Sequence, residues 1–282
     1  MRVTFCGTRG STPAPGSDFV RYGGNTSCVA LAHDDDPARP PTLLLDAGTG
    51  IRRLPELLAD RPFVGTLLLT HLHWDHVQGL PFFTSGDRDD GRVTLLLPGE
   101  DADTDAEQLL ARMMSPPFFP IGPLQLRGTW EFGLVPSTPF DAEGFHVIPL
   151  EIPHKGGRTM GYRVSDGHAV VAYMPDHCPT SFGDGAEGLG EYHQAAVELA
   201  RDADLLVHDS HLRAEEVAAE GSFGHAAAEY AVALGAKAGA RRVALFHHRP
   251  ERDDVAVDTT VRRFADGPVP VMGAAEGVTL SL

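Results

Sequence analysis

Three histidines and one aspartate lie close together in the segment Leu69-Thr70-His71-Leu72-His73-Trp74-Asp75-His76. They follow the apolar run Gly65-Thr66-Leu67-Leu68-Leu69, which predicts a buried strand that ends in a loop. From an extended backbone, His71 and His73 can point at one position, and Asp75 and His76 can point at a second one nearby. Imidazole and carboxylate groups are ligands of zinc, iron and manganese, so the segment predicts the start of a two-metal site. We prefer this interpretation to a solvated, histidine-rich surface loop because the cluster follows a strand of core character.

The pattern His-x-His-x-Asp-His resembles the signature of the metallo-β-lactamase superfamily. The resemblance implies an α/β fold, the αββα sandwich, in which two mixed β-sheets pack together and helices flank them. It also implies metals at one edge of the sandwich, held by loops at strand ends. We expect residues 1–282 to form a single domain of this fold, because no linker or charge block divides the chain.

Three later predicted strands end in residues that match the ligands this resemblance requires. They deliver His154, Asp176 and His247. The resemblance assigns two metals to seven residues: the first takes His71, His73 and His154, the second takes Asp75, His76 and His247, and Asp176 bridges. His248 is the alternative to His247 as the last ligand. Nitrogen and carboxylate donors in these numbers suit two Zn²⁺ ions, with Mn²⁺ or Fe as alternatives. Two close cations would share a water, lower its pKa, and hold the attacking and leaving oxygens.

The predicted strand Thr42–Asp46 ends in an aspartate close to the start of the metal loop in sequence. The superfamily places an aspartate after such a strand, so the resemblance implies that Asp46 orients a ligand histidine. Its other reading is the N-cap of a helix that starts near Ile51, and the two roles are compatible.

Two further segments, Val207-His208-Asp209-Ser210 and Gly224-His225-Ala226, resemble paired motifs of ribonuclease Z and its smaller phosphodiesterase relatives. The resemblance implies that Asp209 orients His225, and that His225 stabilises or protonates the leaving oxygen. We expect His225 at the start of a helix over residues 226–238, where backbone N–H groups favour an anion. The alternative is a surface residue at a helix start. With Asp75, these two complete the predicted catalytic residues. The remaining histidines are assigned structural or surface roles: His33, His146, His168, His177, His193, His208 and His211.

Ribonuclease Z enzymes that trim transfer RNA carry a long arm between the third histidine and the bridging aspartate. Here His154 and Asp176 are only 22 positions apart, a distance filled by two strands and an Asp-Gly turn. The formal net charge of -16 also repels polyanions. The sequence therefore predicts a phosphodiesterase for a small or cyclic phosphodiester, with no long nucleic acid as partner. The alternatives are a hydrolase of a lactone, thioester or β-lactam, a ribonuclease Z-type enzyme of RNA 3′ processing, and a non-catalytic, metal-loaded sensor module.

Other segments bear on substrate contacts, assembly and location. Arg9 and Arg21 flank a glycine-rich loop and are candidate phosphate contacts. The Pro- and Phe-rich segment 115–123 is interpreted as a pocket wall or a contact in a homodimer, or as a cluster packed under its own helix.

No apolar run approaches the ~20 residues of a membrane helix, and the N-terminus lacks the layout of a signal peptide. Three scattered cysteines fit a reducing compartment, so we expect a cytoplasmic protein without a membrane partner.

Overall fold

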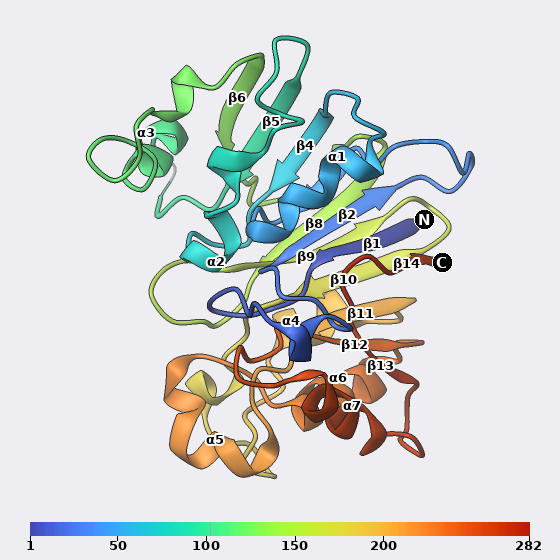
Figure 1. The fold of residues 1–282 in the computed structure, drawn as a ribbon. Coiled ribbons are helices and arrows are strands. Elements are labelled where there is room, and N and C mark those ends of the chain that lie inside the picture. Colours follow the sequence, from blue (N-terminus) through green and yellow to red (C-terminus); the bar gives the residue numbers. More distant parts are fainter. Residues whose placement is uncertain (102) are drawn as a thin grey trace.

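The computed structural model describes residues 1–101 and 103–282. Within them, two seven-stranded β-sheets form the centre of the molecule. The first sheet has the order β14 (Thr279–Ser281), β1 (Arg2–Gly7), β2 (Cys28–Ala32), β3 (Leu43–Leu45), β4 (Val64–Leu68), β5 (Arg92–Leu97) and β6 (Thr129–Leu134). Strands β3 to β6 run parallel, whereas β1 is antiparallel to both β14 and β2. The two termini therefore lie side by side in one sheet (Figure 1).

The second sheet combines a parallel half and an antiparallel half. Its order is β13 (Val271–Gly273), β12 (Val243–Phe246), β11 (Leu205–Asp209), β10 (Val170–Met174), β9 (Met160–Ser165), β8 (Phe145–Glu151) and β7 (Phe140–Ala142). Strands β10 to β13 are parallel to one another, and β9 is antiparallel to both β10 and β8. Strands β8, β10, β11 and β12 consequently all run in the same direction, and their carboxyl ends meet at one edge of the sheet.

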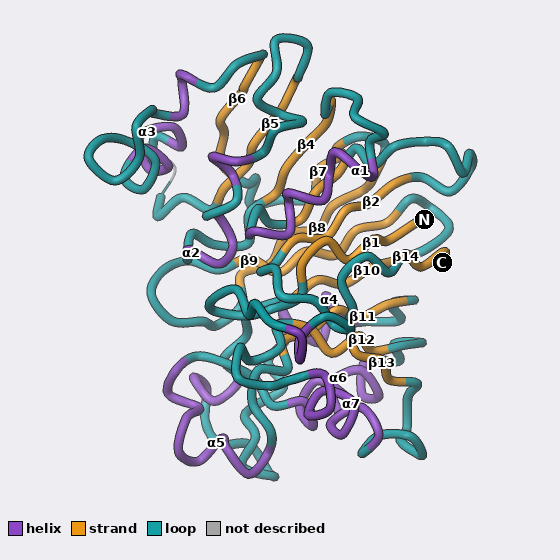
Figure 2. The backbone as a smooth tube through the Cα atoms, in the orientation of Figure 1, coloured by secondary structure: helices purple, strands orange, loops and turns teal. Residues whose placement is uncertain are grey.

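Helices cover the outer face of each sheet (Figures 1 and 2). The first sheet carries α1 (Leu54–Leu57), α2 (Trp74–Val77) and α3 (Ala106–Ala111), and the second carries α4 (Gln194–Ala200), α5 (Ala214–Glu220), α6 (Ala228–Ala238) and α7 (Asp254–Arg262). Within residues 1–101 and 103–282, no helix combines the length and the apolar character needed to cross a bilayer.

The apolar runs of the sequence become strands that are buried on both faces. In β4, Leu68 points into the layer between the sheets, whereas Leu67 points into the layer under α1 to α3. The layer between the sheets contains a run of aromatic contacts, in which Phe246 lies 6.2 Å from Phe5 and 5.7 Å from Tyr173, measured between ring centroids. This packing fixes the strand ends that carry the polar residues described below.

The predicted α/β sandwich is confirmed, and most predicted strands form where the apolar runs lie. Three elements differ in extent. The helix expected over 104–114 is limited to Ala106–Ala111, and the helix expected over 226–238 begins at Ala228. The Asp-Gly hairpin between β9 and β10 has a four-residue loop, since Ser165 pairs with Val170. Strands β6 and β7 and helices α4, α5 and α7 were not anticipated from the sequence pattern.

Candidate metal centre

Four predicted ligands from three strand ends form a first group. His71 and His73 lie in the loop between β4 and α2, His154 follows β8, and Asp176 follows β10. One ligand atom from each residue lies within 4.8 Å of the others. The donor set, three imidazoles and one carboxylate, matches what zinc takes in proteins.

A second group adjoins the first and shares Asp176 with it. Asp75, His76, His247 and Asp176 also bring one ligand atom each within 4.8 Å. The Asp75 carboxylate oxygen Oδ2 lies 3.0 Å from His247 Nε2 and 3.3 Å from His76 Nε2. His73 is extended at φ -64° and ψ 150°, and α2 starts directly after it. This change of backbone direction separates the His71–His73 pair from Asp75 and His76, as the spacing predicted.

Asp176 presents a different oxygen to each group. Its Oδ2 lies 3.3 Å from His154 Nε2 and 3.5 Å from His71 Nε2. Its Oδ1 lies 2.9 Å from His247 Nε2 and 3.1 Å from His76 Nε2. A carboxylate placed in this way can bind two cations at once, so the geometry fits the bridging role.

The buried polar atoms of the two groups fit a pair of cations. His71 Nε2, His76 Nε2 and Asp176 Oδ1 are buried without a hydrogen-bond partner in the described residues, although buried polar atoms are normally satisfied. Burial alone would lower the pKa of His76, but the carboxylates of Asp75 and Asp176 raise it well above its usual value. Burial likewise opposes protonation of His247, whose pKa Asp176 and Asp75 raise to about 10. The centre therefore favours positive charge strongly.

A further layer of contacts fixes the ring of His76. Its Nδ1 donates to Asp46 Oδ2 at 2.8 Å, which leaves Nε2 facing Asp75 and Asp176. Asp46 is in turn held by the Tyr173 hydroxyl at 2.9 Å and by the Thr70 backbone N–H at 2.7 Å. Asp46 thus occupies the orienting position that the resemblance implied. The N-cap interpretation was wrong: residues Thr49–Arg53 form a 3₁₀ helix capped by Gly48, without a side-chain hydrogen bond.

The loop after β1 also supports the second group. The Ser11 backbone N–H donates to Asp75 Oδ2 at 2.7 Å. Gly10 lies against the His247 ring so closely that a Cβ atom at this position would be 2.3 Å from His247 Nδ1. The loop therefore contacts the predicted ligand residues Asp75 and His247, which glycine content alone did not establish.

The candidate phosphate contacts proposed for this region were wrong for Arg9. The Arg9 side chain is completely buried, and its Nε donates to the Gly23 carbonyl at 2.6 Å. Its Nη1 donates to the Arg252 carbonyl, also at 2.6 Å. Arg21 is engaged with Asp258, with 2.6 Å between Nη1 and Oδ2. Arg9 therefore connects neighbouring loops through buried hydrogen bonds, and a substrate cannot reach its side chain.

Asp209 and His225 lie next to the two ligand groups. His225 Nδ1 lies 3.1 Å from Asp209 Oδ2, and the His225 ring centroid is 5.0 Å from His247 and 5.5 Å from His154. The expectation that His225 stands at a helix start was wrong, because α6 begins only at Ala228. The Ala226 backbone N–H is taken by Asp209 Oδ2 at 3.2 Å, so it is not free for an anion.

His211 and His248 differ in their relation to the centre. His211, interpreted as structural, stacks on His225 with 4.2 Å between ring centroids and forms a third close group with His225 and His247. The sequence signal for this contact was the position of His211 two residues after Asp209, because alternate residues of an extended segment point to the same side. His248 instead donates through Nε2 to the Ala274 carbonyl oxygen at 2.9 Å, away from both groups. The structure thus brings His247, rather than His248, to the ligand positions.

The Pro- and Phe-rich segment lies beside α2. Phe118 and Phe119 help to line an apolar hollow of about 430 Å³ together with Trp74 and Phe82. Phe118 is 81% exposed, so the segment is not a closed cluster under its own helix. It forms a pocket wall, and the homodimer remains a prediction.

The chain was compared with known families and structures. A family model described as the beta-lactamase superfamily domain matches residues 42–248. The ribonuclease Z of Natronomonas pharaonis is 24% identical over 301 residues, which cover 88% of this chain and 86% of the relative. The metallo-beta-lactamase fold protein YhfI from Bacillus subtilis has a TM-score of 0.70 at 18% identity, covering 99% of this chain and 98% of that one. A diphosphatase from the PhnP family has a TM-score of 0.67 at 18% identity, covering 100% of this chain and 97% of that one.

Proposed function

The chain belongs to the metallo-β-lactamase superfamily, in its ribonuclease Z-like branch, and from this premise we propose that it is a dinuclear metal-dependent phosphodiesterase for a small or cyclic phosphodiester. The observation that carries the proposal is the arrangement around Asp176, whose two oxygens each face a separate set of ligands. His71, His73 and His154 would hold one cation with it, and Asp75, His76 and His247 the other. Two divalent cations held there would activate water and neutralise charge that develops on a phosphate.

His225 supplies the proton chemistry in this proposal. Asp209 binds His225 Nδ1, which fixes the ring and leaves Nε2 for the leaving oxygen. Asp209 is itself held by the backbone N–H groups of His177 and His211, at 3.1 and 2.9 Å from its two oxygens. The pair is therefore positioned before a substrate arrives, as acid–base catalysis needs.

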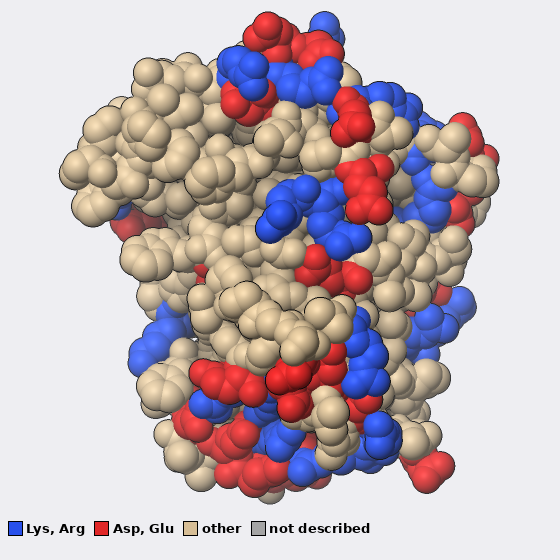
Figure 3. Space-filling model, in the orientation of Figure 1, with Lys and Arg blue, Asp and Glu red and all other residues tan. Residues whose placement is uncertain are grey.

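The preference for a small substrate rests on charge and on the short connection between β8 and β10. Only a short glycine-containing loop and the hairpin of β9 and β10 lie between His154 and Asp176. On the face in Figure 3, basic side chains are interspersed with acidic ones and form no continuous band among the described residues. Long nucleic acids are bound mainly through many phosphate contacts, which such a surface does not favour.

Processing of RNA is the second candidate, because the relative from Natronomonas pharaonis is named ribonuclease Z and is aligned over most of both chains. Hydrolysis of a thioester or lactone at the same centre is a third outcome that the experiment must separate. The Asp209–His225 pair favours a phosphodiester over a thioester, because an alkoxide is a poorer leaving group than a thiolate and gains more from a positioned acid.

The test is a substrate panel with protein loaded with zinc, and separately with manganese. We expect turnover of methyl para-nitrophenyl phosphate or a cyclic nucleotide, and loss of that turnover on chelation. The variant His146→Ala serves as the control protein and should show the same turnover, since His146 is exposed and its partner Asp141 is exposed as well. Turnover of thioesters or lactones in the absence of phosphodiesterase activity would contradict the proposal. Full metal loading with no hydrolysis of any ester would instead favour a sensor module.

A further inference from the structure

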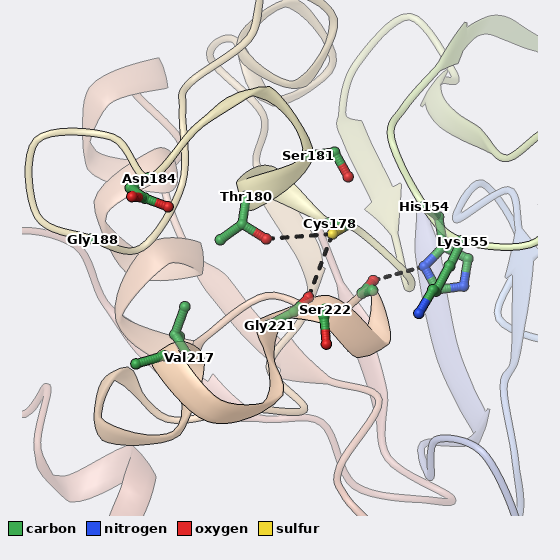
Figure 4. A pocket seen from close by; sticks show the side chains of 12 residues that line it. His154, Lys155, Cys178, Thr180, Ser181, Asp184, Gly188, Val217, Gly221 and Ser222 are labelled. Carbon is green, nitrogen blue, oxygen red and sulfur yellow. Dashed lines mark hydrogen bonds between the residues drawn. The ribbon is translucent and has the colours of Figure 1, made fainter.

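A cavity of about 660 Å³ opens beside the metal ligand His154. It lies between the segment after β10, which includes the 3₁₀ turn Pro179–Phe182, and the α5 region below it (Figure 4). His154 and Lys155 stand at one end, and Asp184 and Val217 stand at the other (Figure 4). Its volume lies in the range of pockets that hold a compact organic ligand, and it is much larger than one phosphate group needs.

The position of the cavity relates it to the leaving group. Gly224 lines the cavity and directly precedes His225 in the chain. The Gly224 carbonyl also accepts a hydrogen bond from His154 Nδ1 at 2.7 Å, so this wall is fixed to the first ligand group. A phosphate at the centre whose leaving oxygen faces His225 therefore directs its alcohol toward this space.

The lining indicates which alcohol fits. Lys155, one of only two lysines in the chain, lies at the end of the cavity next to His154 and the candidate metal centre. Within the described residues, Lys155 forms no ion pair. The hydroxyls of Ser181 and Ser222 and the carboxylate of Asp184 lie farther along and have no side-chain hydrogen bond in that same part of the chain. A carboxylate at the distal end repels a second anion but accepts hydrogen bonds from a pair of hydroxyls.

We propose that this cavity binds the leaving alcohol of the substrate, and that this alcohol is an uncharged, diol-bearing sugar of nucleoside size. Lys155 meets the negative charge on the scissile phosphate, and Asp184 accepts hydrogen bonds from the sugar diol. The inference rests on the proposed phosphodiesterase function, because that function places the phosphate beside His154.

Binding of mononucleotides tests the role of Asp184 without any turnover. Equilibrium binding of uridine monophosphate to the metal-loaded protein is compared with binding of dideoxyuridine monophosphate, which lacks the diol. Asp184→Ala should weaken binding of uridine monophosphate by about tenfold, as loss of a hydrogen bond to a charged group implies, and should weaken the dideoxy compound far less. Glu187→Ala is the matched control, because Glu187 is exposed on the same loop but does not line the cavity. Equal effects of Asp184→Ala on both nucleotides would overturn the proposal.

Filling the cavity tests its position relative to the reacting phosphate. Ala218 lines the cavity from α5, whereas its neighbour Ala219 does not. Ala218→Tyr should lower kcat/KM for the dinucleotide UpU at least about tenfold more than kcat/KM for methyl para-nitrophenyl phosphate, whose groups need less space. Ala219→Tyr should leave the ratio of the two unchanged. A ratio that Ala218→Tyr also leaves unchanged would show that the cavity does not receive the leaving group.

The two measurements separate this inference from the function it rests on. If the metal-loaded protein hydrolyses no phosphodiester, the proposed function fails whatever the cavity does. If it hydrolyses both esters and neither Asp184→Ala nor Ala218→Tyr discriminates between ligands, the function stands and the sugar pocket fails.

Discussion

Asp176 connects the two ligand groups through separate oxygens, so its loss affects both. The intact centre would take about two divalent ions per chain, and we expect Asp176→Ala to bind clearly fewer. The remaining histidines keep some affinity, so the content falls without vanishing. Elemental analysis after gentle purification measures the effect. Asp141→Ala is the control, because the Asp141 side chain is 80% exposed. Full occupancy in Asp176→Ala would remove the residue from the bridge.

His225 carries the second prediction at the scale of a residue. Because its Nδ1 is bound to Asp209 and it stands beside both groups, His225→Ala should retain metal and lose kcat by roughly 10²–10⁴-fold. Asp209→Asn should show a smaller loss, since it affects the orientation of the ring while keeping the ring itself. Steady-state kinetics together with metal analysis separate the roles. Loss of metal in His225→Ala would identify it as a ligand instead.

The proximity of the predicted ligand residues could be anticipated from the sequence, whereas the burial of individual polar residues could not. His71, His73, Asp75 and His76 share one short segment after an apolar strand, so their proximity followed from local spacing. The burial of Arg9 follows from carbonyls of Gly23 and Arg252, and the latter is more than 200 positions away. His211 was missed for a related reason: its contact with His225 depends on the path of α5 between them.

The loop that follows β1 is the element on which the second ligand group depends most closely. A Cβ at Gly10 would lie 2.3 Å from His247 Nδ1, a distance that requires the ring or the loop to move. Gly10→Ala should therefore lower metal content and kcat together while the sheets remain folded. Circular dichroism and elemental analysis test this. Gly122→Ala is the matched control, since its Cβ would meet no atom closer than 3.8 Å. Unchanged metal content in Gly10→Ala would show that His247 tolerates the shift.

The turn between β9 and β10 gives a prediction about stability and pH. Burial alone would raise the pKa of Asp166, but the backbone N–H groups of Ala169 and His168 bind its carboxylate and lower the pKa to about 2. Asp166→Ala should lower the free energy of unfolding by about 1–2 kcal/mol near neutral pH. The folded-state pKa is below the unfolded value of about 3.9, so this contribution is complete above about pH 4 and is lost toward about pH 2.

Denaturant unfolding at several pH values measures the contribution of Asp166. The difference between wild type and Asp166→Ala should shrink as the pH falls below about 4. Asp141→Ala should show no comparable difference, because the Asp141 side chain in β7 is exposed. A difference that persists unchanged in acid would mean that the backbone conformation of the turn, and not the ionised carboxylate, sets the stability difference.

Elements were predicted where apolar runs are long, and they were misplaced where tertiary contacts compete with local propensity. Strand β4 follows directly from its leucines. Helix α6 starts late because the Ala226 N–H is bound by Asp209 and the Ala228 N–H by the Leu212 carbonyl. These bonds hold the residues before α6 in extended backbone, an effect of the end of β11 and of the segment that follows it. Helix α7 was missed because its apolar side is narrow and its sequence is largely polar.

At the scale of the whole molecule, the sandwich explains why ligands spread over nearly 180 positions come together. Strands β8, β10, β11 and β12 run in the same direction, and each ends at the edge where the loop after β4 arrives. The fold was predictable from the His-x-His-x-Asp-His segment and the later strand ends. The cavity beside His154 was not, because Ser181, Asp184 and Val217 lie on connections whose path the sequence pattern leaves open.

Net charge and the short β8–β10 connection determine the last prediction, which concerns substrate size. A long RNA would need many basic contacts, and 23 lysines and arginines stand against 39 acidic residues. Affinity for RNA through such contacts falls steeply with salt, by about one power of salt concentration per phosphate contact. We therefore expect turnover of aryl or cyclic phosphodiesters that changes little with ionic strength, and negligible trimming of precursor transfer RNA. Rates on both substrates, measured across a salt series with the same metal-loaded protein, decide the matter. Efficient, salt-sensitive removal of a transfer-RNA 3′ trailer would place the protein with the ribonucleases.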